Sequence, residues 1–156
     1  MKITLYTDGA CSKGNGGWAY SNITGGVKGS GNERESSNNR MELRACIEAL
    51  KDPLIPEWVD LVLVTDSAYV SNCFLQNWWS TWVRNDWRRG PKKEPVKNRE
   101  LWEELLNLVW GRVGNVEWVH VRGHGKGKND DPLHVQGNDI VDKMAVAARL
   151  ELVGAR

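Results

Sequence analysis

The sequence lacks any hydrophobic run long enough to cross a membrane. A purely aliphatic run at residues 61–64 has only the length of a strand, whereas a membrane helix needs about 20 apolar residues. The first ten residues, MKITLYTDGA, lack the apolar stretch of a signal peptide. We therefore expect a cytoplasmic protein that has no membrane partner.

Cysteine is also scarce. The three cysteines, Cys11, Cys46 and Cys73, form no CxxC spacing, which argues against a disulfide framework or a zinc knuckle and favours burial as small apolar residues. The 156 residues are 40% hydrophobic and 26% charged, a balance that supports one globular core. Because no internal repeat or linker interrupts the chain, we interpret residues 1–156 as a single domain.

The net charge is only +1, but the basic residues are concentrated in one segment. Residues 84–99 contain seven Lys or Arg and two acidic residues, a local charge of +5, so the remaining residues carry −4. Four of the nine tryptophans precede or lie in this segment: Trp78, Trp79, Trp82 and Trp87. This pattern predicts a basic protrusion at about 78–97 that binds an anionic polymer. The alternative is a solvated basic loop.

The hydrophobic pattern predicts three strands, then helices alternating with strands. We expect strands at residues 2–8, around 18–20, near Val27, at 59–65 and at 115–121, with loops at 29–37 and 122–137. We expect helices that begin near Asn38 or Asn39, Ser67, Asn98 and Asn138, whereas residues 78–97 have no simple period. Short turns join antiparallel strands and helical crossovers join parallel strands, so the fold class is α/β with a mixed sheet.

Four acidic residues, each on a separate element, lie near element ends: Asp8, Glu42, Asp66 and Asp142. Taken singly, each suits a turn, a helix cap or the positive end of a helix dipole. Ligands of α/β sheets, however, bind beyond the carboxyl ends of strands, and converging carboxylates repel one another unless a cation such as Mg²⁺ binds them. The four acids therefore predict a site for one or two Mg²⁺ ions, with Mn²⁺ as a substitute, that cleaves phosphodiesters.

Motifs along nearly the whole chain resemble type 1 ribonuclease H. They are TDGA (7–10), NNRMEL (38–43), TDSAYV (65–70), PVKN (95–98) with LW (101–102), and Gly123-His124 followed by Gly137-Asn138 and Asp142. The resemblance implies a ribonuclease H-like fold, in which a five-stranded mixed sheet, three antiparallel strands and then parallel strands, is flanked by helices. It also implies endonucleolytic hydrolysis of the RNA strand of an RNA–DNA hybrid to 5′-phosphate and 3′-hydroxyl ends.

The same resemblance assigns metal binding and catalysis to Asp8, Glu42, Asp66 and Asp142. Asp139 is the rival for the last position. Asn138 and Asp142 are four residues apart and share a helix face, whereas Asp139 would point about 100° away, so we favour Asp142. His124 matches the histidine that assists water activation or product release in the family, while we expect His120 and His134 to be structural or exposed.

The resemblance also implies how the hybrid is held. Asn38, Asn39, Gly9 and the backbone at Cys11 would contact the RNA strand and the minor groove, where a 2′-hydroxyl both donates and accepts hydrogen bonds. Helix capping is the alternative role for the two asparagines. The other implied contacts are a DNA-strand phosphate site (Ser37, Arg40, Asn98), Asn138 beside the metal site, and the protrusion (Trp87, Arg88, Arg89, Lys92, Lys93).

Some positions depart from the family pattern. The glycine-rich loop after Cys11 is shorter than usual, Ala68 replaces a polar residue, and the loop at 125–137 is long. A catalytically silent hybrid-binding module and a DNA-cutting relative are the two rival interpretations. The intact acids disfavour the first, and the asparagine pair with the basic segment disfavours the second. We expect a monomer that acts on RNA–DNA hybrids.

Overall fold

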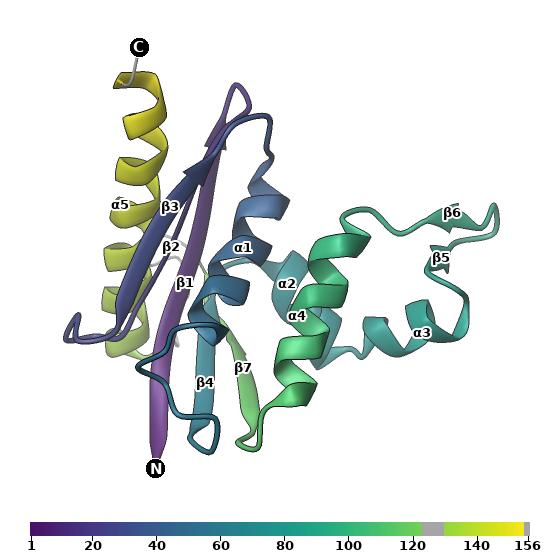
Figure 1. The fold of residues 1–156 in the computed structure, drawn as a ribbon, viewed down its shortest axis with the longest axis horizontal. Coiled ribbons are helices and arrows are strands. Elements are labelled where there is room, and N and C mark those ends of the chain that lie inside the picture. The colour runs from purple at the N-terminus through teal and green to yellow at the C-terminus, as the bar shows by residue number, and fades with distance from the viewer. Residues whose placement is uncertain (123–129, 155–156) are drawn as a thin grey trace.

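A computed structural model describes residues 1–122 and 130–154 of the chain. Its main feature is a five-stranded mixed sheet with the order β3-β2-β1-β4-β7 (Figure 1). Strand β1 pairs antiparallel with β2 and parallel with β4, and β4 pairs parallel with β7. The expected fold class is therefore confirmed. The strands are β1 (Lys2–Ser12), β2 (Asn15–Ser21), β3 (Lys28–Glu33), β4 (Asp60–Thr65) and β7 (Val116–His120).

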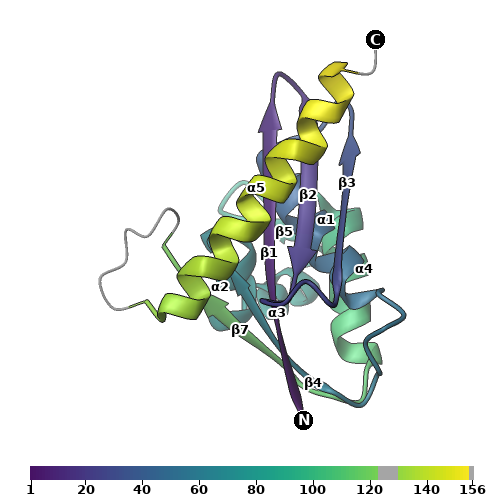
Figure 2. The ribbon, with the colours of Figure 1, turned by 90° about the vertical axis from the view of Figure 1, so that its left-hand side faces the viewer.

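Helices cover both faces of this sheet. Helix α5 crosses β1, β2 and β3 on one face, whereas α1 packs on β1 and β2 from the other face and contacts α4 (Figure 2). The helices are α1 (Asn38–Leu50), α2 (Ala68–Leu75), α3 (Trp78–Arg84), α4 (Arg99–Gly111) and α5 (Pro132–Gly154). Within the described ranges, no helix combines the length and the hydrophobicity needed to cross a membrane.

Alternation along the central strands builds two separate cores. Leu5 belongs to the core beneath α1 and α4, while its neighbour Tyr6 belongs to the core beneath α5. Strand β4 divides in the same way, with Leu63 on the first side and Val64 on the second. Since successive side chains of a strand point to opposite faces, burial on both faces explains why residues 61–64 are all apolar.

Two strands differ from their predicted bounds. Strand β1 continues to Ser12, so Asp8 lies inside the strand and not at its end. The glycine-rich loop contracts to a tight turn in which Lys13 and Gly14 have φ of 52° and 80°. The third strand, predicted near Val27, is β3 at residues 28–33, so it extends through 29–33, where the polar, glycine-containing sequence was expected to be a loop. Pairing with β2 supplies the backbone hydrogen bonds that this sequence does not signal by hydrophobicity.

Two helix starts also differ from the prediction. Ser37, and not Asn38 or Asn39, is the N-cap of α1, and its hydroxyl accepts a hydrogen bond from the Arg40 amide. Helix α5 begins at Pro132, six residues before the expected start, so the predicted loop is helical over 132–137. The Asp131 carboxylate accepts from the Leu133 amide at 2.8 Å, which supplies the cap that the hydrophobic pattern alone did not indicate.

The basic protrusion has more structure than its sequence predicted. Helix α3 leads into a small antiparallel hairpin formed by β5 (Arg88–Arg89) and β6 (Glu94–Pro95). Trp82 anchors it: the indole is buried, with ring centroids 5.9 Å from Trp87 and 5.1 Å from Trp102 of α4. Trp82 therefore belongs to the hydrophobic core and attaches the protrusion to the body through its contact with Trp102.

Candidate active site

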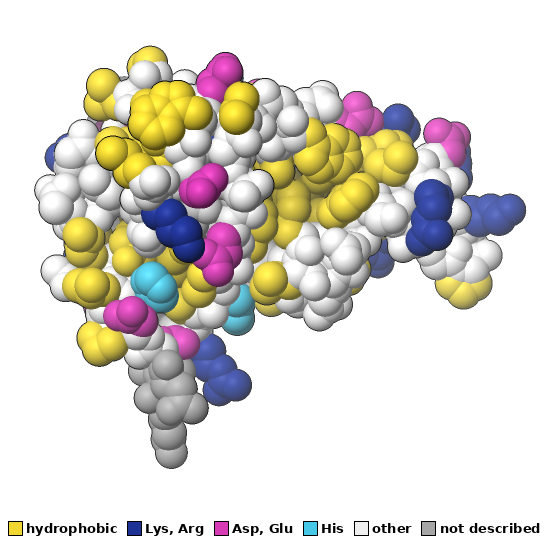
Figure 3. Space-filling model, turned by 90° about the horizontal axis from the view of Figure 1, so that it is seen from below, with side chains coloured by type: hydrophobic (Ala, Val, Ile, Leu, Met, Phe, Trp, Pro, Cys, Tyr) yellow, Lys and Arg dark blue, Asp and Glu magenta, His cyan; other side chains and the backbone are white. Residues whose placement is uncertain are grey.

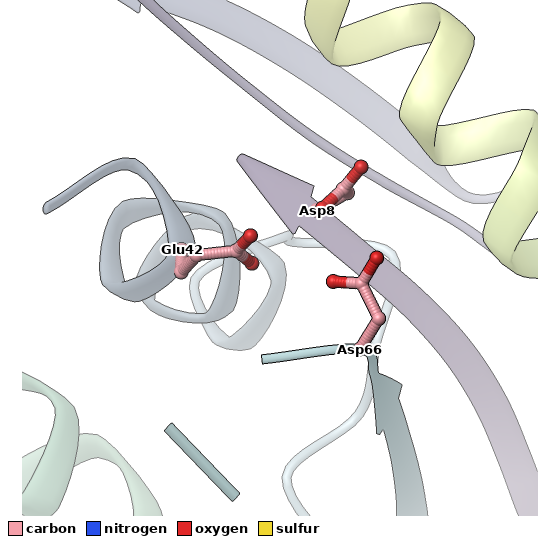
Figure 4. Close-up of side chains that lie close together, drawn as sticks. All are labelled: Asp8, Glu42 and Asp66. Atoms are coloured by element: carbon pink, nitrogen blue, oxygen red, sulfur yellow. The ribbon is translucent and has the colours of Figure 1, made fainter. Parts of the chain in front are cut away.

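Three of the four predicted acids converge where β1 passes the end of β4. Thr7 and Thr65 are the last paired residues of these parallel strands, so Asp8 and Asp66 follow them side by side. Glu42 reaches the same place from α1, and one carboxylate oxygen from each of the three acids lies within 4.8 Å of the others. Figure 4 shows the three side chains pointing into a common space.

A glycine allows Glu42 to reach this space. A Cβ atom at Gly9 would lie 2.5 Å from both the Glu42 nitrogen and the Met41 carbonyl carbon, a distance that real side chains do not tolerate. Helix α1 therefore contacts β1 closely only because residue 9 has no side chain. Gly9 therefore has a packing role that brings Glu42 to Asp8, and its predicted contact with the substrate stays a prediction.

Asp142 joins the cluster from α5. Its side chain is half-buried and lies close enough to Asp8 to contribute to the raised pKa of that carboxyl, whereas the rival Asp139 is exposed. Asp142 lies well inside α5, so a role at the positive end of the helix dipole is excluded. Close packing fixes this helix: a Cβ atom at Gly17 of β2 would lie 2.1 Å from the Ala145 carbonyl oxygen.

Burial and mutual repulsion disfavour ionisation of the cluster. The pKa of Asp8 is raised to about 8, first by burial and then by the charge of Asp66. The pKa of Glu42 is raised well above its ordinary value by burial and by the charges of Asp8 and Asp66. A positive ion among these oxygens would remove that penalty.

The donor atoms suit a hard divalent cation. Carboxylate oxygens are the ligands that Mg²⁺ and Mn²⁺ prefer. Within the described part of the chain, the buried Oε2 atom of Glu42 has no hydrogen-bond partner, and a buried carboxylate oxygen needs one. The carboxylate oxygens of Asp8, Glu42 and Asp66 therefore fit a divalent metal ion.

The predicted RNA contacts lie together at the start of α1. The Oδ1 atom of Asn38 accepts a hydrogen bond from the Cys11 backbone N–H at 2.8 Å, so β1 and α1 are joined here. Asn38 and Asn39 are both exposed. Because Ser37 provides the cap, neither asparagine is needed to cap the helix, and the Asn39 side chain is free of a cap role.

The predicted phosphate-binding residues Arg40 and Asn98 belong to a hydrogen-bond network that also includes residues not predicted for the site. The Arg40 Nη1 donates to Asn98 Oδ1 at 3.3 Å and to Glu100 Oε1 at 2.5 Å. The Asn98 amide donates to the Tyr69 hydroxyl, which also accepts from the Trp102 indole. Sequence reasoning missed Tyr69 and Glu100, and the 60 residues between Arg40 and Glu100 left no local signal for their contact.

A groove separates this network from the protrusion. Its volume is about 710 Å³, and Asn39, Tyr69 and Asn98 line it on one side. The residues from the protrusion and its anchor are Trp78, Trp82, Arg89, Gly90, Glu94, Pro95, Val96 and Lys97. Figure 3 views the molecule from below and shows Lys and Arg side chains on the protrusion.

The predicted protrusion residues divide into two groups. Trp87 lies outside the lining of this groove: it packs on Trp82, and the Arg99 guanidinium lies 5.3 Å from its ring centroid. The basic residues Arg88, Arg89, Lys92 and Lys93 are all exposed. Arg89 lines the groove, whereas Arg88 and Lys93 line a second hollow of about 390 Å³.

The remaining predicted site residues have different outcomes. Asn138 is 4% exposed, and its Oδ1 atom has no hydrogen-bond partner among the described residues. His124 lies outside the described residues. The His120 ring contacts the Asp66 carbonyl oxygen at 3.2 Å, and the His134 ring contacts the Tyr6 hydroxyl at 3.0 Å, which agrees with structural roles for both.

The sheet order and the helices around it define the ribonuclease H-like class of folds. A crystal structure of LC9-RNase H1, described as a type 1 RNase H with the type 2 active-site motif, superposes with a TM-score of 0.73 and 26% identity, covering 96% of this chain and 72% of that one. The foamy viral protease-reverse transcriptase, solved in complex with dsDNA, superposes with a TM-score of 0.75 and 21% identity. The superposition covers 96% of this chain and 94% of that one, and it supports the fold alone.

Sequence comparison identifies the family. The RNase H family model matches residues 1–149. Ribonuclease H of Acetivibrio thermocellus is 41% identical over 146 residues, or 91% of this chain and 96% of that protein. Ribonuclease H of Caldicellulosiruptor saccharolyticus is 45% identical over 147 residues, with coverage of 92% and 95%. This chain belongs to the RNase H family of endonucleases, which cleave RNA in RNA–DNA hybrids.

Proposed function

We propose that the protein cuts the RNA strand of RNA–DNA hybrids internally, leaving 5′-phosphate and 3′-hydroxyl ends, with Mg²⁺ held by Asp8, Glu42 and Asp66. Mn²⁺ would substitute, and one or two ions would bind. The convergence of three carboxylate oxygens within 4.8 Å of one another carries this proposal. Membership of the family supports the choice of an RNA–DNA hybrid as substrate.

The carboxylates have distinct tasks in this proposal. When bound, the metal supplies positive charge that activates an attacking water and stabilises the leaving oxygen. Asp8 and Glu42 would lose their protons as the ion binds, because their raised pKa values reflect burial and repulsion that the ion offsets. Asp66 and Asp142 are half-buried, so they would form the part of the cluster that substrate and water reach.

Several elements would hold the substrate. The exposed Asn38 and Asn39 would read the minor groove and the 2′-hydroxyls beside the Cys11 backbone. On the other strand, Arg40 and Asn98, with Ser37 nearby, would bind a DNA phosphate. The four exposed basic residues of the protrusion, of which Arg89 lines the groove, would follow the DNA backbone, and Trp87 would support them by packing on Trp82.

Three further assignments belong to the proposal. Asn138 would use its buried amide oxygen, which has no partner among residues 1–122 and 130–154, to order a water beside Asp142. His124 would assist proton transfer or product release. The enzyme would act as a cytoplasmic monomer, which sedimentation at micromolar concentration would test: a dimer mass that persists on dilution would contradict it.

One experiment tests the proposed function directly. End-labelled RNA paired with DNA is incubated with the native protein, with Asp8→Asn and with the exposed control Asp139→Asn, in Mg²⁺, in Mn²⁺ or in EDTA. We expect internal cuts that require the metal and Asp8 and that persist in the Asp139 variant, with RNA–RNA and DNA–DNA duplexes spared. Absence of cuts in both metals while the hybrid remains bound would refute the proposed activity.

A further inference from the structure

The Arg40 guanidinium, assigned above to a DNA phosphate, already has a carboxylate partner. Its Nη1 atom lies 2.5 Å from Glu100 Oε1, and the same nitrogen donates to Asn98 Oδ1. The contact also holds the pKa of the Glu100 carboxyl below its ordinary value, so the group is charged at neutral pH. The nitrogen that would bind a phosphate oxygen is therefore occupied by a negative group of this chain.

The position of this ion pair makes competition with substrate possible. Asn98, bonded to the same Arg40 nitrogen, lines the 710 Å³ groove between the body and the protrusion. The Glu100 side chain is 65% exposed and the Arg40 side chain 30% exposed. Exposed ion pairs contribute little free energy, so a phosphate can displace the carboxylate, but the displaced charge would then remain beside the DNA backbone.

We propose that Glu100 is a built-in competitor for Arg40, which lowers the affinity of the enzyme for its hybrid substrate and promotes product release. This inference rests on the proposed function, because it takes Arg40 as a DNA-phosphate contact. Each binding event exchanges the Glu100 carboxylate for a phosphate oxygen on the Arg40 guanidinium. Glu94, an exposed acid that lines the groove from the protrusion, has no contact of this kind among the described interactions.

The chain provides a closely matched control. One turn further along both helices, Arg44 of α1 pairs with Glu104 of α4, with 3.7 Å between Nη1 and Oε2. Glu104 carries the same charge on the same helix, about 5.4 Å further along its axis. Neither Arg44 nor Glu104 lines the groove. Glu104→Gln thus removes an equal charge, together with the ion pairs of Glu104 to Arg44 and Lys51, without releasing the phosphate-binding arginine.

The test measures hybrid binding and cleavage separately. Dissociation constants for an RNA–DNA hybrid are measured in Mg²⁺ in the Asp8→Asn background, where the hybrid stays intact, and KM and kcat are measured in the otherwise native protein. We expect Glu100→Gln to lower Kd and KM about two- to fivefold, without raising kcat. The slope of log Kd against log salt concentration should become steeper by up to about one unit, which corresponds to one more released counterion. Glu104→Gln should change Kd by less than about 1.5-fold.

A double-variant cycle shows whether Glu100 acts through Arg40. The affinity gained from Glu100→Gln should largely disappear in an Arg40→Gln background. Equal effects of Glu100→Gln and Glu104→Gln, or the same gain with and without Arg40, would overturn the inference while hybrid cleavage by the native protein stays intact. A native protein that does not cut the hybrid would overturn the proposed function as well.

Discussion

The carboxylate cluster and the basic protrusion carry opposite charges, and they differ as much in burial as in sign. Asp8 is 3% exposed and Glu42 is 8% exposed, held by a central strand and a packed helix. The four basic residues of the protrusion are exposed in and around a hairpin whose two strands have two residues each. Metal chemistry needs carboxylates fixed at short distances, whereas phosphate attraction tolerates mobile charges, so the two regions place different demands on the fold.

This difference predicts that single changes in the cluster have much larger effects than single changes in the protrusion. Removing one fixed ligand alters the only place where the metal binds in the proposed mechanism. Removing one exposed charge leaves the others to attract the same backbone. The predictions below test this contrast, starting with the largest expected effect.

The sharpest test compares two neighbouring acids of α5. Asp142→Asn should lower kcat by about a hundredfold or more, because Asp142 is half-buried beside Asp8 and contributes to its raised pKa. Asp139→Asn should leave kcat within about twofold, since Asp139 is exposed. Steady-state cleavage of a labelled hybrid checks both values. Comparable losses in the two variants would show that Asp142 has been assigned wrongly.

Neutralising the protrusion should affect binding and spare chemistry. Replacing Arg88, Arg89, Lys92 and Lys93 by Gln should weaken hybrid binding about tenfold or more at low salt. It should also flatten the salt dependence of binding, by about 0.9 for each phosphate that the variant no longer neutralises. The rate at saturating substrate should stay within about threefold, because the carboxylate cluster is untouched.

Two lysines outside the protrusion provide the control for that variant. Lys2 and Lys28 begin β1 and β3, and their replacement by Gln should change the salt dependence less for each charge removed. If the protrusion variant and the Lys2/Lys28 variant change the salt dependence equally for each charge removed, the protrusion contributes only net charge and does not contact phosphate.

His124 should have an intermediate effect. His124→Ala is expected to slow turnover about tenfold without abolishing it, because a histidine assists proton transfer at neutral pH while the metal ligands stay in place. Single-turnover and steady-state rates on the same hybrid separate chemistry from product release. The control is His134→Gln, because the native His134 ring contacts Tyr6. Equal rates for the native protein and the His124→Ala variant would remove His124 from the mechanism.

The smallest effect concerns stability without metal. Native Asp8, with a pKa raised to about 8, keeps a proton that the unfolded chain loses near pH 3.8. The native state therefore binds more protons over this interval, and the free energy of unfolding should fall as pH rises from about 4 to 8. The fall attributable to Asp8 should be about 1 kcal/mol or more, since one unit of pKa corresponds to about 1.4 kcal/mol.

Urea unfolding in EDTA measures this effect. Asp8→Asn should show a shallower fall than the native protein between pH 5 and 8, and it should be the more stable of the two at the upper end. Added Mg²⁺ should stabilise the native protein and change the variant little. Parallel pH curves for the two proteins would contradict a buried, protonated Asp8.

Local chemistry made much of this structure predictable. Helix starts at Ser67 and Asn98 and the buried strand after Val59 follow from side-chain type and period over a few residues. The extent of β3, which was predicted as a short strand near Val27, and the first turns of α5 were not predictable from such local patterns. The first gains its hydrogen bonds from β2 and the second its cap from Asp131, so hydrophobic pattern alone carried no signal for either.

The sequence by itself determined the order of the five sheet strands and of the helices outside the protrusion, the mixed sheet, the family motifs and the four acids. Only the tertiary structure decided how these acids meet: Asp8 lies inside β1 beside Asp66, and Gly9 lets α1 bring Glu42 to them. It also decided that Arg40 contacts Glu100, 60 residues away. Short-range propensity acts between neighbours in the chain, whereas carboxylate spacing and ion pairing depend on how closely packed elements approach one another in space.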